Sequence, residues 1–65
     1  MSWLADIRRQ RGLSQQAVAQ LAHVTQPTYC NIENGRRNPS VETARNIAQV
    51  LSFSWTKFFE EGGNA

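Results

Sequence analysis

The stretch LSQQAVAQLAHVTQPTYCNIENG, residues 13–35, decides how this chain folds. Ser14 and Thr25 each precede a run of residues that is compatible with a helix, and their hydroxyl oxygens can accept hydrogen bonds from the unpaired N–H groups of a helix start. Gly35 suits the left-handed conformation that commonly ends a helix. The stretch therefore predicts two short helices joined by a tight turn, Gln15–Ala22 and Gln26 to about Asn34.

Apolar residues recur at helical spacing in both predicted helices. In the first helix, the predicted buried face consists of Ala17, Val18, Leu21 and Ala22. Ala19 is small, as a close crossing of two helices requires. In the second helix, Tyr29 and Ile32 are predicted to reach the core. The helical period then turns the other side outward. That outer side comprises Gln26, Pro27, Thr28, Cys30, Asn31 and Asn34.

The rest of the chain divides into three further helices. A first helix is predicted to reach about Arg11, where Gly12 stops it. Ser54 precedes a short helix from Trp55 to about Phe59, and residues 60–65 are predicted to form a flexible tail. Ser40 precedes a longer helix, Val41–Leu51, with Val41, Ala44, Ile47, Ala48 and Leu51 facing inward. The sequence thus predicts an all-α five-helix bundle, a single domain over residues 1–59.

Composition excludes several classes of protein. A chain of 65 residues, 40% of them hydrophobic, suffices for one small domain with one core. The single cysteine, Cys30, has no partner for an internal disulfide, as is usual in a reducing compartment. No apolar run has the length of a membrane span, and no signal-peptide pattern is present. We therefore expect a cytoplasmic protein without membrane contact.

The arginines are unevenly distributed. Arg8, Arg9 and Arg11 lie near the start and Arg36 and Arg37 in the middle, with no Lys or Arg between Gly12 and Gly35. Basic clusters on both sides of an amide-rich segment suit phosphate contacts that frame a base-reading surface, although charge alone also fits an ordinary solvated surface. Gln and Asn amides can pair with adenine, and a Thr methyl can contact the thymine methyl.

In this context the sequence resembles the XRE-type helix-turn-helix family, which includes phage lambda repressor and the Cro proteins. The resemblance extends from about Leu4 to Phe59. It depends on Arg8 placed before Gly12 and on the segments LSQQAVAQLA, VTQPTY, NIENGRRNPS and ARNIAQVLSFSW, in this order. It implies a lambda-repressor-like five-helix bundle that inserts its third helix into the major groove of double-stranded DNA, usually as a homodimer.

The resemblance also implies roles for individual residues. The positions that reach base edges are Gln26, Pro27, Thr28 and Asn31. The positions that contact phosphate are Gln15, Thr25, Arg36, Arg37 and Asn38, although Gln15 can also serve only the start of its helix. Arg9 and Arg11 fit either a phosphate contact or plain surface. Arg8 and Glu33 match a partly buried salt bridge between the first and third helices.

Two positions depart from the family pattern. His23 stands in the turn where glycine is usual, so a side chain must tolerate a left-handed conformation there. Pro27 stands where a polar base-reading residue is common, and it offers only apolar contact and shape. Both departures bear on base preference and leave the predicted fold unchanged.

The aromatic residues near the two ends are predicted to be mostly core. Trp55, Phe58 and Phe59 are also candidates for a dimer patch. The functional prediction is a transcriptional repressor that binds a pseudo-palindromic operator as a homodimer. The alternatives are an antitoxin or another module whose main partner is a protein, and a controller protein of a restriction-modification system.

No catalytic, phosphate-binding or metal-ligating constellation is present in the sequence. His23 and Cys30 lie on different elements, and no second histidine accompanies them. We therefore expect no enzyme activity, no cofactor, no metal and no small-molecule ligand.

Overall fold

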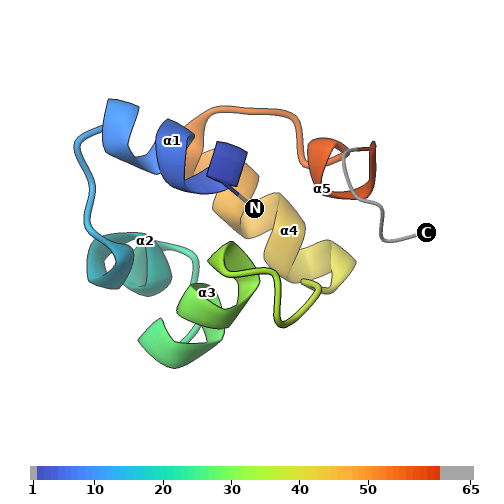
Figure 1. Cartoon of the computed structure of the whole chain (residues 1–65), viewed down its shortest axis with the longest axis horizontal. Helices are drawn as coiled ribbons and strands as arrows, with labels where there is room; N and C mark the ends of the chain where they lie inside the picture. Colours follow the sequence, from blue (N-terminus) through green and yellow to red (C-terminus); the bar gives the residue numbers. More distant parts are fainter. Residues whose placement is uncertain (1, 61–65) are drawn as a thin grey trace.

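The computed structural model describes residues 2–60, which form five helices and no strand (Figure 1). The helices are α1 (Ser2–Gln10), α2 (Gln15–Leu21), α3 (Gln26–Glu33), α4 (Val41–Leu51) and α5 (Lys57–Glu60). The predicted all-α five-helix bundle is thus confirmed. The fifth helix begins two residues later than predicted and includes Glu60, and the rest of the predicted tail, residues 61–65, lies outside the described residues.

Three helix starts are capped by the hydroxyl groups expected to cap them. The Oγ of Ser14 accepts the N–H of Ala17 at 3.0 Å, and Thr25 Oγ1 accepts the N–H of Thr28 at 3.3 Å. Ser40 Oγ accepts the N–H of Thr43 at 3.2 Å. Each cap satisfies one N–H that the helix itself leaves unpaired, which fixes where the helix begins.

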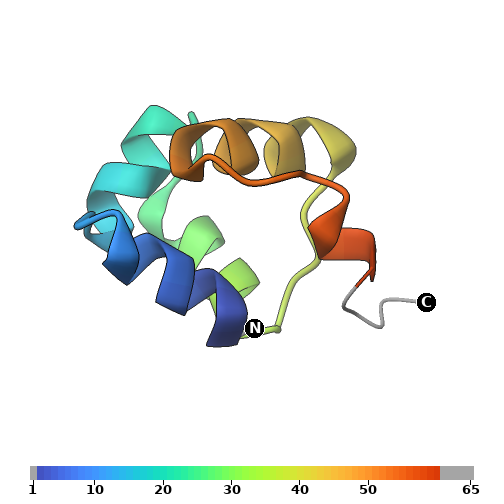
Figure 2. The ribbon, with the colours of Figure 1, turned by 90° about the horizontal axis from the view of Figure 1, so that it is seen from above.

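The core lies between helices that enclose it from several sides. Seen from above, α1 and α4 lie on opposite sides of the molecule, α2 lies at one end and α5 at the other (Figure 2). Both α2 and α3 send small or apolar side chains into the space between these helices. The core cluster consists of Leu4, Val18, Ala19, Ala22, Tyr29, Ile32, Ala44, Ile47, Leu51 and Phe58.

Two residues that were predicted to face inward are exposed, so these predictions were wrong. Leu21 is 57% exposed because it lies at the edge of α2, where it lines a shallow hollow together with His23 and Val50. Val41 is 51% exposed because, as the first residue of α4, it lies beyond the row of buried residues that begins at Ala44.

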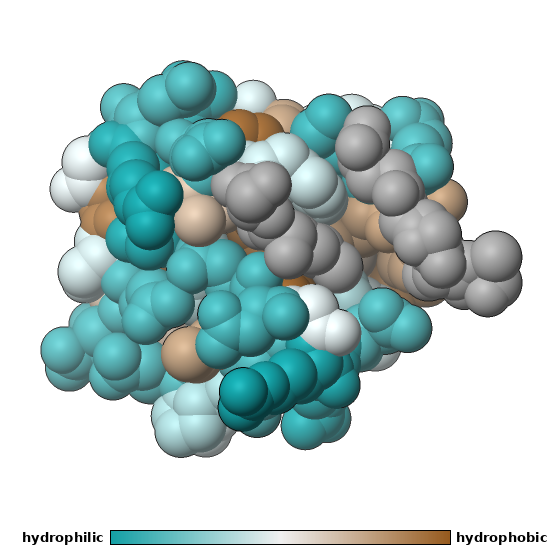
Figure 3. Space-filling model, viewed as in Figure 1, coloured by the Kyte–Doolittle hydropathy of each residue, from teal (hydrophilic) through white to brown (hydrophobic). Residues whose placement is uncertain are grey.

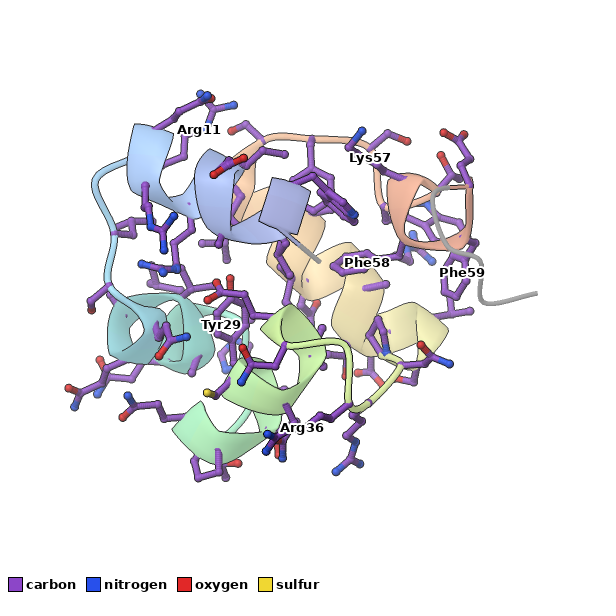
Figure 4. The ribbon with its side chains drawn as sticks, in the orientation of Figure 1. Arg11, Tyr29, Arg36, Lys57, Phe58 and Phe59 are labelled. Carbon is purple, nitrogen blue, oxygen red and sulfur yellow. The ribbon has the colours of Figure 1, made fainter. Side chains whose placement is uncertain are left out.

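An aromatic cluster closes the core beside α5. The ring of Trp3 packs edge-on against Phe53 and Phe58, with centroids 5.5 and 5.3 Å apart. The Nζ of Lys57 lies 5.1 Å from the centroid of Trp3. Phe58 is only 2% exposed, so its predicted place in a surface patch is wrong: in this chain it belongs to the core. Figure 4 shows Phe58 pointing toward α4 and Phe59 on the outer side of α5.

The turn between α2 and α3 has the left-handed residue that was expected. His23 has φ 63°, a conformation that costs a residue with a β-carbon more than it costs glycine. Ser52, which follows α4, has the same φ of 63° and was not anticipated. Gly12 and Gly35 have positive φ values as well, which agrees with their predicted roles as helix stops.

Candidate nucleic-acid interface

The inner side of α3 is fixed by a polar junction of four side chains, which we call the Glu33 junction: Arg8, Gln15, Tyr29 and Glu33. Arg8 Nε donates to Glu33 Oε2 at 2.8 Å, and the two side chains are only 12% and 7% exposed. The hydroxyl of Tyr29 donates to the same oxygen at 2.8 Å. Gln15 Nε2 donates to the other oxygen, Oε1, at 2.7 Å. The salt bridge that the sequence predicted is therefore present, within a larger network.

The Glu33 junction shifts the pKa values of its members. Burial alone would raise the pKa of Glu33, but hydrogen bonds from Arg8, Gln15 and Tyr29 outweigh it and lower that pKa below 4.5. The hydrogen bond to Glu33 raises the pKa of Arg8. Burial, together with the adjacent carboxylate, raises the pKa of Tyr29 well above its ordinary value. All three groups are thus held in the states that bond to one another.

The junction connects three helices and one loop. Arg8 belongs to α1, Gln15 to α2, and Tyr29 and Glu33 to α3. Arg8 also donates through Nη1 to the carbonyl oxygen of Leu13, in the loop between α1 and α2, at 2.9 Å. Because α1 and α2 each donate a hydrogen bond to the carboxylate of α3, through Arg8 and Gln15, the orientation of α3 relative to these two helices is strongly determined.

The outer side of α3 presents polar and apolar side chains to solvent. Gln26 and Pro27 are exposed, and Thr28 and Asn31 are partly exposed. Within residues 2–60, the side-chain amides of Gln26 and Asn31 make no hydrogen bond. All four residues that were predicted to contact bases therefore lie on accessible positions of one helix.

A basic loop follows α3 directly. Arg36, Arg37 and Asn38 are exposed, and the backbone N–H groups of the two arginines donate to the carbonyl oxygen of Asn31 at 2.9 and 3.2 Å. These bonds attach the loop to the end of α3. Figure 4 shows Arg36 at the α3 side of the molecule, away from α1 and α5. The surface over α2 and α3 is largely hydrophilic, whereas apolar residues are visible beside α5 (Figure 3).

Other sequence-predicted residues have structural partners. Thr25 is the N-cap of α3, and its hydroxyl lies 2.8 Å from that of Thr28. Gln15 is committed to Glu33, as described above. Trp55 is partly buried and packs edge-on against the exposed Phe59, with ring centroids 5.8 Å apart. Trp55 and Phe59 thus remain candidates for a dimer patch.

Arg11 has a role that sequence reasoning missed. Its Nε donates to the carbonyl oxygen of Leu51 at 2.8 Å, and its Nη2 lies 3.4 Å from that of Ser52. A guanidinium at the end of α4 satisfies carbonyl groups that the helix leaves unpaired. The local sequence around Arg11 does not indicate that its partner is the end of α4. Arg9, by contrast, forms an exposed ion pair with Asp6 at 3.7 Å.

Comparison with known proteins identifies the class. The helix-turn-helix family profile matches residues 4–58. The chain therefore belongs to the XRE-type helix-turn-helix family of DNA-binding transcriptional regulators. No solved structure gave a significant match. Among residues 2–60, no helix has the length and apolar character needed to cross a membrane.

Relatives carry the names of transcriptional regulators. The chain is 42% identical over 59 residues to the uncharacterized HTH-type transcriptional regulator YqaF of Bacillus subtilis, covering 91% of this chain and 78% of that protein. It is 40% identical over 50 residues to y4dJ of Sinorhizobium fredii, covering 77% of this chain and 65% of the relative. It is 34% identical over 58 residues to PuuR of Escherichia coli, covering 89% of this chain but only 31% of PuuR.

Proposed function

We propose that this protein is a sequence-specific regulator of transcription that binds double-stranded DNA through the outer side of α3. The observation that carries the proposal is the position of Gln26 and Asn31 on α3, beside the exposed Arg36 and Arg37. Both amides are accessible and make no hydrogen bond within residues 2–60. Amides of this kind can form paired hydrogen bonds with adenine in the major groove. The arginines supply the positive charge that phosphates attract.

The rigid inner side of α3 supports the same proposal. Base reading requires a helix whose orientation does not vary, since its side chains must meet donors and acceptors at fixed positions. The Glu33 junction gives α3 such an orientation without using the outer side chains. Residues Gln26, Pro27, Thr28 and Asn31 then contact bases, and the exposed Arg36, Arg37 and Asn38 contact phosphates. Thr25 and Gln15, which were also predicted to contact phosphate, already donate to Thr28 and Glu33, so we assign them the positioning of α3.

We further propose that the protein binds as a homodimer and represses transcription by occupying its operator. A single small domain with few phosphate contacts binds weakly at physiological salt. Two copies on half-sites about one helical turn, roughly 34 Å, apart combine their contacts. Trp55 and Phe59, apolar residues at the α5 surface, are the candidate contacts between copies.

The test is selection of bound sequences from a pool of random duplexes, at low and at near-physiological salt. We expect the wild type to enrich a pseudo-palindromic motif. Gln26→Ala and Asn31→Ala should blur the motif at defined positions. Gln49→Ala is the matched control, because Gln49 is an exposed amide on α4, outside the proposed interface, and its replacement should leave the motif unchanged.

Other outcomes would contradict parts of the proposal. If no sequence is enriched and binding disappears as salt rises, only nonspecific attraction to phosphate remains, and a protein partner becomes the better explanation. If the motif is an unpaired half-site, the homodimer is wrong while base reading by α3 stands. If Gln49→Ala blurs the motif as much as Asn31→Ala does, α3 is not the reading element.

A further inference from the structure

The first turn of α3 has few backbone N–H groups to offer. Pro27 has none, the N–H of Thr28 donates to Thr25 Oγ1 at 3.3 Å, and the N–H of Tyr29 donates to the Thr25 carbonyl oxygen at 3.0 Å. Of the first four residues of α3, only Gln26 therefore has an N–H outside these bonds. Anions bind at helix starts through such groups, so this helix start is poorly suited to hold a phosphate at Pro27.

Pro27 instead presents an apolar ring next to an amide. Pro27 is exposed and Asn31 is partly exposed. They are four residues apart on α3, so their side chains are neighbours on the same side of the helix. The ring of Pro27 can neither donate nor accept a hydrogen bond, and in the free protein it faces water. Pro27 and Asn31 thus place a small apolar surface next to an amide that can form paired hydrogen bonds.

The major-groove edges of DNA offer one apolar group that suits this surface. It is the 5-methyl group of thymine, whereas the adenine edge offers a donor and an acceptor that match an Asn amide. We infer that Pro27 is a specificity-determining residue that contacts a thymine methyl group, next to an adenine read by Asn31. The inference rests on the proposed function and names one chemical feature of the half-site.

The expected effect follows from the size of a methyl group. Burying one such group is worth about 0.8 kcal/mol, which corresponds to about a fourfold change in Kd. In the selected duplex, each thymine of one half-site is replaced in turn by deoxyuridine, which lacks only this methyl group. For the wild type, we expect Kd to increase about fourfold at the thymine that Pro27 contacts.

The same series is then measured with Pro27→Ser. Serine is well tolerated near a helix start and removes the ring. We expect Pro27→Ser to bind the thymine duplex more weakly than the wild type and to bind the matching uracil duplex no worse than the thymine duplex. Uracil effects at thymines contacted by other residues should persist. Thermal unfolding verifies that the variant is folded, and Pro27→Ala, which also lacks the ring, provides a second series.

The possible results separate this inference from the proposed function. If the wild type selects a motif that Asn31→Ala blurs, but no thymine shows a uracil effect that depends on residue 27, then the inference is wrong while the function stands. If uracil weakens the wild type and both Pro27 variants equally, the inference is again wrong. If no motif is selected at all, the proposed function fails, and the inference fails with it.

Discussion

The two sides of α3 differ in how their polar groups are bonded. On the inner side, the carboxylate of Glu33 accepts hydrogen bonds from Arg8, Gln15 and Tyr29 and is 7% exposed. On the outer side, the amides of Gln26 and Asn31 make no hydrogen bond within residues 2–60. The inner side determines stability and orientation, whereas the outer side keeps its hydrogen-bonding capacity for a partner. Substitutions on the two sides should therefore affect different measurements.

The largest effect is expected from breaking the inner side. Glu33→Ala removes the acceptor of three side chains and leaves the charge of Arg8 without its partner, so the free energy of unfolding should decrease by about 3 kcal/mol. Glu42→Ala is the control, because Glu42 is an exposed acid in the first turn of α4, where its loss should change stability by less than about 1 kcal/mol. Denaturant unfolding measures both. Arg8→Ala and the double variant of Arg8 and Glu33 complete a double-mutant cycle. If the losses of stability are purely additive, Arg8 and Glu33 do not interact.

A second, smaller effect concerns Tyr29, which donates to the carboxylate of Glu33. Tyr29→Phe should cost about 2 kcal/mol at neutral pH, since a hydrogen bond to a charged group is lost. Because burial and Glu33 raise the pKa of Tyr29, the folded chain keeps a proton that the unfolded chain loses above pH 10. The contribution of Tyr29 to the free energy of unfolding should be fully present below pH 10 and should decrease as the pH rises further.

The chain has a single tyrosine, so absorbance of the phenolate follows its ionisation directly. The alkaline loss of stability should be absent from Tyr29→Phe. An ordinary tyrosine titration in the folded wild type would contradict the buried hydrogen bond. At acidic pH the dependence is reversed, because folding lowers the pKa of Glu33. The ionised carboxylate stabilises the folded chain above pH 4.5, and this contribution is lost as the pH falls through the pKa of Glu33 in the folded state.

On the outer side, the expected effect is on binding. Arg36→Ala should leave thermal stability unchanged, weaken binding to all duplexes about equally, and reduce the slope of log Kd against log salt by about one. Arg45→Ala is a matched control, because Arg45 is an exposed arginine on α4, outside the proposed interface. If the slope of log Kd against log salt is the same for both variants, the basic loop is not part of the interface.

The smallest effect on stability is expected in the turn between α2 and α3. His23 has φ 63°, so His23→Gly should relieve the strain of a β-carbon and raise the free energy of unfolding by about 0.5 kcal/mol. Ser52→Gly, at the other strained position, should give a similar gain. A lower melting temperature in both variants would mean that these side chains contribute more than their backbone strain costs.

Sequence reasoning succeeded where the determinants are local. Ser14, Thr25 and Ser40 cap the helices that follow them, and Gly12 and Gly35 stop helices, because each acts within a few residues of itself. These signals located the starts of α2, α3 and α4, whereas α5 begins two residues later than the position predicted from Ser54. The salt bridge between Arg8 and Glu33 could not be predicted from local signals, and its prediction came from the family resemblance.

The failures concern contacts that depend on how the helices pack. Helical periodicity predicts a broad apolar face, but the neighbouring helices cover only part of it, so Leu21 and Val41 remain exposed. Gln15 and Arg11 bond to residues far away in the chain, and nothing in their local sequence indicates those partners. The base-contacting role of the outer side remains a prediction.

The bond between Arg11 and Leu51 has a consequence for the order of folding. It joins residues 40 positions apart, whereas α2, α3 and α4 follow one another through short connections. Closing a long loop costs more chain entropy than forming contacts between adjacent elements, so such contacts tend to form late. We therefore expect α1 to be the last helix to pack against the others during folding. Its amide hydrogens should then exchange with solvent sooner than those of α4.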